Sequence, residues 1–190
     1  DSNKVTDIIK ENIPAWTSSM ATQDYESQDK LDPQHEGKLL TRVEEFVSSH
    51  SAIILEDYSK GIFSKENLQN FISIGKSNNK LVAVDPGRGK PADFYKGASL
   101  LKPNLVEAEE LVASLGYRDK ELDKICEILV SELDLDMLAL TLGSKGMALF
   151  DKNNSKTVEV IPTVATEVYD VSGAGDTVIS TLMSSLIAGA

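Results

Sequence analysis

The chain alternates short, fully apolar runs with longer segments that carry a single apolar stripe. Apolar runs typical of buried strands stand at 52–55, 81–84, 99–101, 137–141, 147–150 and 157–161. Apolar residues at helical spacing predict helices from about residue 38, after Ser64, from about 105, at about 119–132 and from near Gly173 onward. Continuous apolar strands separated by amphipathic helices predict an α/β fold, with a mostly parallel sheet and helices on both faces.

The first 36 residues do not follow this pattern. They are polar, and Asp32-Pro33 marks a break before the first clear helix. We therefore predict an irregular arm, or the remnant of an N-terminal part, over 1–36, and the α/β domain over 37–190.

Charge narrows the set of partners. Asp and Glu number 30 against 19 Lys and Arg, which gives a net charge of -11. Nucleic acids and anionic membranes both attract cationic surfaces, so neither is an expected partner. The chain has no apolar run of membrane-spanning length, and its one cysteine, Cys126, lies at helical spacing among apolar residues. We expect a core thiol and a cytoplasmic protein.

Polar clusters follow four of the predicted strands, at 56–61, 85–90, 102–104 and 141–146. Ligands of parallel α/β sheets bind beyond the carboxyl ends of the strands. The four clusters together therefore predict one ligand site at that edge.

A further cluster, Asp170–Asp176, stands between an extended segment and the last predicted helix. Gly173, Ala174 and Gly175 are small, so backbone N–H groups at the helix N-terminus can approach an anion. Asp176 lies just inside the helix, where a carboxylate could accept a proton from an attacking hydroxyl. The alternative is a turn that only packs the helix on the sheet, with Asp176 favourable to the helix dipole.

Two other motifs also have structural alternatives. Asn104 and Glu107 have the spacing of a helix capping box. The segment Thr141–Gly146 could be no more than a hairpin turn. Neither motif alone decides between a structural role and a ligand site.

In combination these motifs resemble the signatures of the PfkB/ribokinase family of carbohydrate kinases. Asp170–Asp176 is similar to D-x-x-G-A-G-D, Asn104–Glu107 to N-x-x-E, and Thr141–Gly146 to T-x-G-x-x-G. The resemblance implies a ribokinase-like fold without the N-terminal lid and a cytoplasmic phosphotransferase that uses ATP and Mg²⁺. It also implies the following roles: Asp176 as catalytic base; Gly173, Ala174 and Gly175 as anion hole; Asn104, Thr141, Gly143, Gly146 and Asp170 at the nucleotide; Glu107 at the hydrated Mg²⁺.

The order of clusters is closest to the heptose-7-phosphate kinases of the ADP-heptose synthase group. This likeness implies a manno-heptose 7-phosphate as acceptor and its 1,7-bisphosphate as product, and it leaves a homodimer open as the assembly. Asp57, Lys60 and Asp85 are weaker candidates for the acceptor site, and Lys60 could equally be a solvated surface lysine.

Family members carry a glycine-rich sugar signature before this region and continue past its end. We therefore expect a fragment, truncated at its C-terminus, that lacks most of the sugar pocket. The remaining alternatives are a kinase for another sugar or nucleoside, and a non-catalytic nucleotide-binding fragment.

Overall fold

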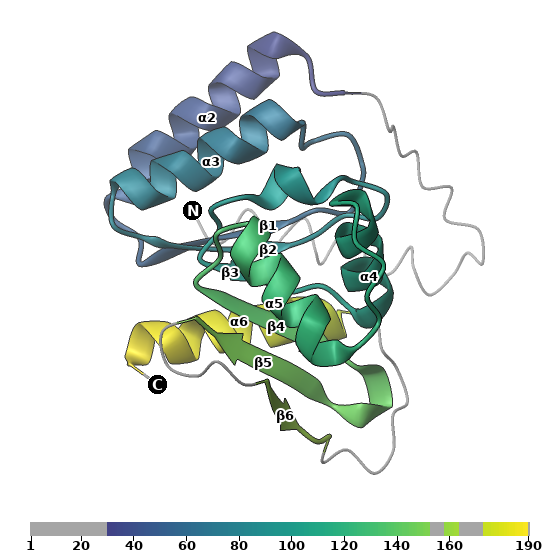
Figure 1. Cartoon of the computed structure of the whole chain (residues 1–190). Coiled ribbons are helices and arrows are strands. Elements are labelled where there is room, and N and C mark those ends of the chain that lie inside the picture. Colours follow the sequence, from purple (N-terminus) through teal and green to yellow (C-terminus); the bar gives the residue numbers. More distant parts are fainter. Residues whose placement is uncertain (1–29, 153–157, 164–172, 190) are drawn as a thin grey trace, which may run out of the picture.

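The computed structural model describes residues 30–152, 158–163 and 173–189, and Figure 1 shows their arrangement. Six strands form one sheet: β1 (Ala52–Glu56), β2 (Leu81–Asp85), β3 (Leu100–Leu101), β4 (Met137–Thr141), β5 (Met147–Asp151) and β6 (Glu159–Ile161). They lie side by side in chain order. The pairs from β1 to β4 are parallel, whereas β5 and β6 are antiparallel to their neighbours. The predicted α/β fold with a mostly parallel sheet is confirmed.

Helices cover both faces of the sheet. They are α2 (Pro33–Val47), α3 (Lys65–Ser77), α4 (Leu105–Ser114), α5 (Leu122–Glu132) and α6 (Ala174–Ala188), with short 3₁₀ turns η1 (Ala92–Tyr95) and η2 (Gly143–Lys145). The crossovers between parallel strands place α3, α4 and α5 on one face, as expected when successive connections share one hand. Helix α6 lies on the opposite face (Figure 1).

Side chains alternate between the two faces of the sheet, so the hydrophobic core consists of two layers, one on each face. Val82 and Val84 of β2 pack with α3, α4 and α5, whereas Ala83 between them packs with Ile179 and Met183 of α6. Side chains of a strand point alternately to its two faces, so each strand serves both layers. Burial on both faces explains why the strand sequences are apolar throughout.

Helix α2 begins earlier than the apolar stripe indicates. The stripe predicts a helix from about residue 38, but the helix begins at Pro33. The Asp32 side chain accepts hydrogen bonds from the N–H groups of Gln34 and His35, both at 3.0 Å, and proline is favourable in the first turn. The break at Asp32-Pro33 is thus a helix start. The rest of the arm, 1–29, lies outside the described residues.

The described ranges bear on two expectations, about membrane spans and about the cysteine. None of their helices is long and apolar enough to cross a membrane. Cys126 is fully buried in α5, and its burial raises the thiol pKa to about 12. The interpretation of Cys126 as a core thiol is confirmed.

Candidate active site

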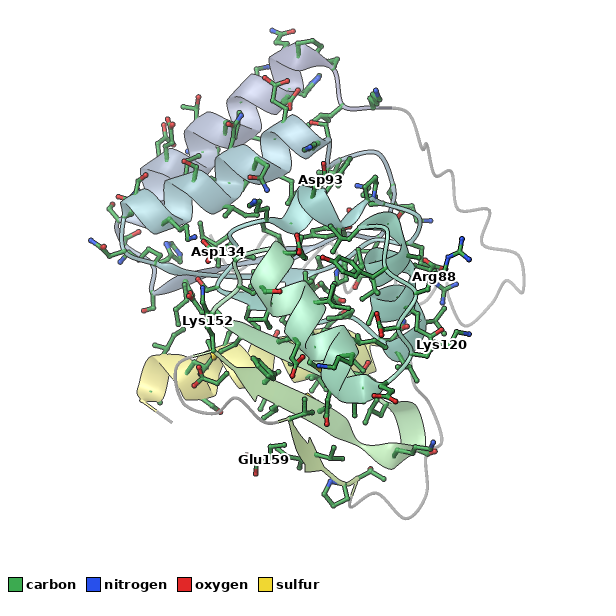
Figure 2. The ribbon with its side chains drawn as sticks, in the orientation of Figure 1. Arg88, Asp93, Lys120, Asp134, Lys152 and Glu159 are labelled. Atoms are coloured by element: carbon green, nitrogen blue, oxygen red, sulfur yellow. The ribbon has the colours of Figure 1, made fainter. Side chains whose placement is uncertain are left out.

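A cavity of about 270 Å³ opens at the carboxyl edge of β1 and β2. Its lining residues come from the loops after these two strands and from the first turn of α4: Glu56, Asp57, Tyr58, Ser59, Asp85, Pro86, Arg88 and Glu107. Two of the predicted clusters and the N-x-x-E motif therefore meet at one place. Arg88 projects from the rim, with 84% of its side chain exposed (Figure 2).

Asp57 is fixed in the wall of this cavity. Its N–H donates to the carbonyl of Asp85 at 3.0 Å, and its Oδ1 accepts from the N–H of Ser59 at 2.9 Å. The Lys90 ammonium lies 2.5 Å from Asp57 Oδ2, yet the direction of approach does not meet hydrogen-bond geometry. The contact is an ion pair, because opposite charges this close attract in any orientation. Gly87 permits the packing, since a Cβ there would lie 2.8 Å from Asp57 Oδ2.

Asp85 forms a second ion pair deeper in the site. Its Oδ2 lies 2.7 Å from Lys102 Nζ, and only 5% of the Lys102 side chain is exposed. Burial raises the pKa of Asp85, the Lys102 ammonium opposes that rise, and the charge of Asp176 adds to it. A Cβ built on Gly175 would lie 3.3 Å from Lys102 Nζ and 3.4 Å from Asp85 Oδ2. The glycine turn therefore rests directly on this pair.

The N-terminus of α6 directs backbone N–H groups towards the same edge. Gly173 caps the helix in the left-handed conformation, with φ at 71°, which favours glycine. Its carbonyl accepts from both the N–H and the hydroxyl of Thr177, each at 3.0 Å. The first N–H groups of a helix have no intrahelical acceptor, so those of Ala174 and Gly175 can bind an anion.

The structure links Asp176 to a residue that the motifs did not single out. The hydroxyl of Tyr58 donates to Asp176 Oδ2 at 2.7 Å and also lies 3.5 Å from Glu56 Oε2. The bond to Asp176 is the main cause that raises the pKa of Tyr58 to about 12. Burial, and then the charges of Asp176 and Asp85, raise the pKa of Glu56.

The N-x-x-E motif forms a helix capping box, which is the structural alternative left open by the sequence. The N–H of Asn104 donates to Glu107 Oε2, and the N–H of Glu107 donates to Asn104 Oδ1, both at 2.9 Å. Glu107 nevertheless lines the cavity, and its other oxygen, Oε1, lies 3.9 Å from Arg88 Nε. Capping therefore uses Oε2 of Glu107 and leaves Oε1 available for other contacts.

Thr141 lies beside this motif, because its N–H donates to the carbonyl of Pro103 at 2.9 Å. Gly143 and Gly146 follow in the β4–β5 connection and are not among the cavity's lining residues. Gly146 has φ at 100°, and a Cβ there would lie 2.0 Å from the carbonyl oxygen of Ile161. The need for glycine at 146 is therefore explained by the packing of the hairpin on β6.

The two further candidates are Lys60 and Asp170. Lys60 is exposed in the loop after β1 and is not among the residues that line the cavity. Asp170 lies outside the described residues. The sequence analysis did not single out four residues of the site: Tyr58, Glu56, Lys90 and Lys102. A detectable signal was the presence of charged and aromatic residues directly after apolar strands, because buried charges require partners.

The fold belongs to the ribokinase-like class of α/β proteins. The structure is similar to the tetrameric inhibited form of phosphofructokinase-2 from Escherichia coli, with a TM-score of 0.68, 20% identity, and coverage of 85% of this chain and 52% of that one. It is also similar to Arabidopsis thaliana ribokinase complexed with ribose and ATP, with a TM-score of 0.62, 20% identity, and coverage of 85% and 48%. At these identities the likeness establishes the fold.

The chain belongs to the pfkB family of carbohydrate kinases, whose model matches residues 17–190. It is 36% identical over 180 residues to the bifunctional protein HldE of Wolinella succinogenes, which covers 95% of this chain and 37% of the relative. It is 46% identical over 139 residues to HldE of Psychromonas ingrahamii, covering 73% and 28%. The chain thus spans about a third of the length of these relatives.

Proposed function

We propose that this chain is the catalytic part of an ATP-dependent sugar kinase in which Asp176 is the base. The observation that carries the proposal is the convergence of Asp176, the amides of the glycine turn and the Lys102–Asp85 pair at one edge of the sheet. Phosphoryl transfer is catalysed largely by positioning and by stabilisation of charge on the transferring group. This edge offers a proton acceptor next to an anion site, as such a reaction requires.

In the proposed reaction the acceptor hydroxyl lies against Asp176. Asp176 takes the hydroxyl proton while the acceptor oxygen bonds to the γ-phosphorus of ATP and the bond to ADP breaks. The N–H groups at the start of α6 stabilise the charge of the transferring group. Gly175 has no side chain, so the group can approach the helix end closely.

The charge of the cavity supports a requirement for a divalent cation. Its lining holds four carboxylates, from Glu56, Asp57, Asp85 and Glu107. Lys90 and Lys102 pair with Asp57 and Asp85, which leaves Glu56, Glu107 and the neighbouring Asp176 against the guanidinium of Arg88. Such a lining repels nucleotide phosphates unless a cation accompanies them. Mg²⁺ keeps several waters and needs only one or two carboxylates.

The residues present fit Mg²⁺ held mainly by phosphates and water. Within the described ranges, no group of three or more His, Cys, Asp or Glu is arranged to bind a metal ion. Glu107, with Oε1 outside the capping box, is the proposed ligand or water-mediated ligand. Bound Mg²⁺ would neutralise phosphate charge and orient the γ-phosphate. Asn104, Thr141, Gly143, Gly146 and Asp170 are proposed at the nucleotide.

The proposed acceptor is heptose 7-phosphate, converted to heptose 1,7-bisphosphate in ADP-heptose synthesis. The support is the identity to HldE proteins, at 36% and 46% in the two relatives above. The proposed division of the chain is a remnant of the N-terminal part over 1–36 and the catalytic domain over 37–190. We propose that Asp57 and Asp85, each held in place by an ion pair, lie near the acceptor. Lys60 is proposed to contact the phosphate of the acceptor.

The test compares Asp176→Asn with the unchanged protein, in the full-length protein that contains this chain. Substitution of an acid–base group is expected to lower kcat by about 10²–10⁴-fold. Activity within about tenfold of the unchanged protein would rule out Asp176 as the base. The acceptor is tested separately: heptose 7-phosphate should give a higher kcat/KM than fructose 6-phosphate or ribose, and equal values would overturn the heptose assignment.

A further inference from the structure

The hydroxyl of Tyr58 connects the loop after β1 to the first turn of α6. Tyr58 follows β1 and Asp176 belongs to the first turn of α6, yet Tyr58 Oη donates to Asp176 Oδ2 at 2.7 Å. A hydrogen bond from a neutral donor to an ionised carboxylate is among the stronger kinds in proteins. Its acceptor is the group proposed as the base, so this contact bears directly on how that group is held.

Packing does not account for the position of the Tyr58 side chain. The residue is 61% exposed, so its ring gains little from burial. The backbone on either side is fixed instead: Asp57 is held by Asp85 and Lys90, and the hydroxyl of Ser59 donates to the carbonyl of Arg88 at 3.2 Å. A rigid loop therefore presents an exposed phenol whose described polar contacts are two carboxylates.

Those two carboxylates repel each other. Glu56 Oε2 lies 3.5 Å from the Tyr58 hydroxyl, and the charge of Asp176 is one of the causes that raise the pKa of Glu56. One hydroxyl can donate only one proton at a time, and the shorter contact marks Asp176 as the acceptor. The phenol thus separates the two charges and stabilises the one that must accept a proton.

We infer that Tyr58 is a positioning residue that holds Oδ2 of Asp176, so that Oδ1 is the oxygen that faces the acceptor hydroxyl. The inference rests on the proposed function of Asp176 as the base. A carboxylate whose orientation is fixed before the acceptor arrives needs no rearrangement in the reaction. Glu56 Oε2, 3.5 Å from the same hydroxyl, is only its alternative acceptor.

The kinetic test uses Tyr58→Phe in the full-length protein, which removes the hydroxyl and keeps the ring. We expect kcat to fall by about ten- to a hundredfold, the range for loss of a hydrogen bond to a charged group, with the KM for ATP unchanged. A role confined to stability would instead leave kcat of the folded protein unchanged and lower only the midpoint of urea unfolding.

Tyr117→Phe is the matched control. The hydroxyl of Tyr117 donates to Glu132 Oε1 at 2.8 Å, the same pairing of phenol and carboxylate, but neither residue lines the cavity. This variant should keep the kcat of the unchanged protein. An equal fall of kcat in both variants, or no fall in Tyr58→Phe, would overturn the positioning role.

A second measurement needs no turnover. Tyrosine labelled with ¹³C at Cζ is titrated by NMR in the unchanged protein and in Asp176→Asn. Because the bond to Asp176 is the main cause that raises the pKa of Tyr58 to about 12, the asparagine variant should return it towards 10. An unchanged Tyr58 titration would overturn the contact. If Asp176→Asn remains active while the Tyr58 titration moves, the contact stands and the role of Asp176 as base falls.

Discussion

Lys102 Nζ lies 2.7 Å from Asp85 Oδ2, and the two groups form the floor on which Gly175 rests. The lysine side chain is 5% exposed. Burial of one of these charges without the other is costly, so removal of either partner alone should destabilise the fold. This dependence leads to the first prediction.

Lys102→Met should destabilise the fold by about 3 kcal/mol, because it leaves the Asp85 carboxylate without its counter-charge in a largely buried place. Lys152→Met is the control, since Lys152 pairs with Asp134 at 2.8 Å on the surface, where solvent screens the two charges and the loss of stability should be much smaller. Urea unfolding of both variants gives the two values. Equal losses would show that burial of the Lys102 pair adds nothing.

Gly175→Ala should lower turnover more than stability. The added methyl would lie 3.3 Å from Lys102 Nζ, within the space proposed for the transferring group, whereas alanine is itself favourable in a helix. Gly37→Ala in α2 is the matched control, because no atom lies within 4 Å of its added Cβ. We expect that control to gain up to about 1 kcal/mol with full activity. Assays of kcat beside thermal unfolding separate the two effects.

Glu56→Gln should change how stability depends on pH. Burial and two neighbouring carboxylates raise the pKa of Glu56 above its ordinary 4.5 in the folded chain. The folded state therefore holds the proton to higher pH than the unfolded state, and stability falls as pH rises from about 4.5 through the raised pKa. The glutamine variant lacks this loss, so its advantage should grow from pH 4 to pH 7.

Glu45→Gln is the control for the removal of one carboxylate, because Glu45 is a surface residue paired with Arg42. Urea midpoints measured at half-unit pH intervals check both variants. A Glu56→Gln curve parallel to that of the unchanged protein would contradict the raised pKa.

Cys126 should not react with iodoacetamide in the folded protein at pH 8. Its thiol is fully buried, and a pKa of about 12 leaves almost no thiolate at that pH. Labelling should therefore follow global unfolding by urea, with the same midpoint as the loss of helical signal. Rapid labelling without denaturant, detected by mass spectrometry, would contradict the buried position.

The fold and the edge that carries the site could both be predicted from the apolar runs. Strands buried on both faces are apolar throughout, so polar clusters such as 56–61 and 85–90 mark where each strand ends. Parallel strands share one carboxyl edge, which brings Asp57, Asp85 and Glu107 to a single cavity, whereas no residue of the clusters 102–104 and 141–146 lines it.

The contacts between distant residues could not be predicted in this way. Tyr58 and Asp176 are 118 positions apart, and no periodicity relates an exposed tyrosine to a carboxylate at that distance. The Lys102–Asp85 pair depends on the register of β2 and β3, which only packing fixes. The start of α2 was misplaced because a side-chain cap at Asp32, not an apolar stripe, sets it.

Helix α6 packs against β1 and β2 although it is the last described element of the chain (Figure 1). Contacts of such long sequence separation require the closure of a large loop before they stabilise anything. The glycine turn and the Tyr58–Asp176 bond can therefore form only when α6 docks on the sheet. Recovery of the Tyr58–Asp176 contact during refolding would thus report the docking of α6.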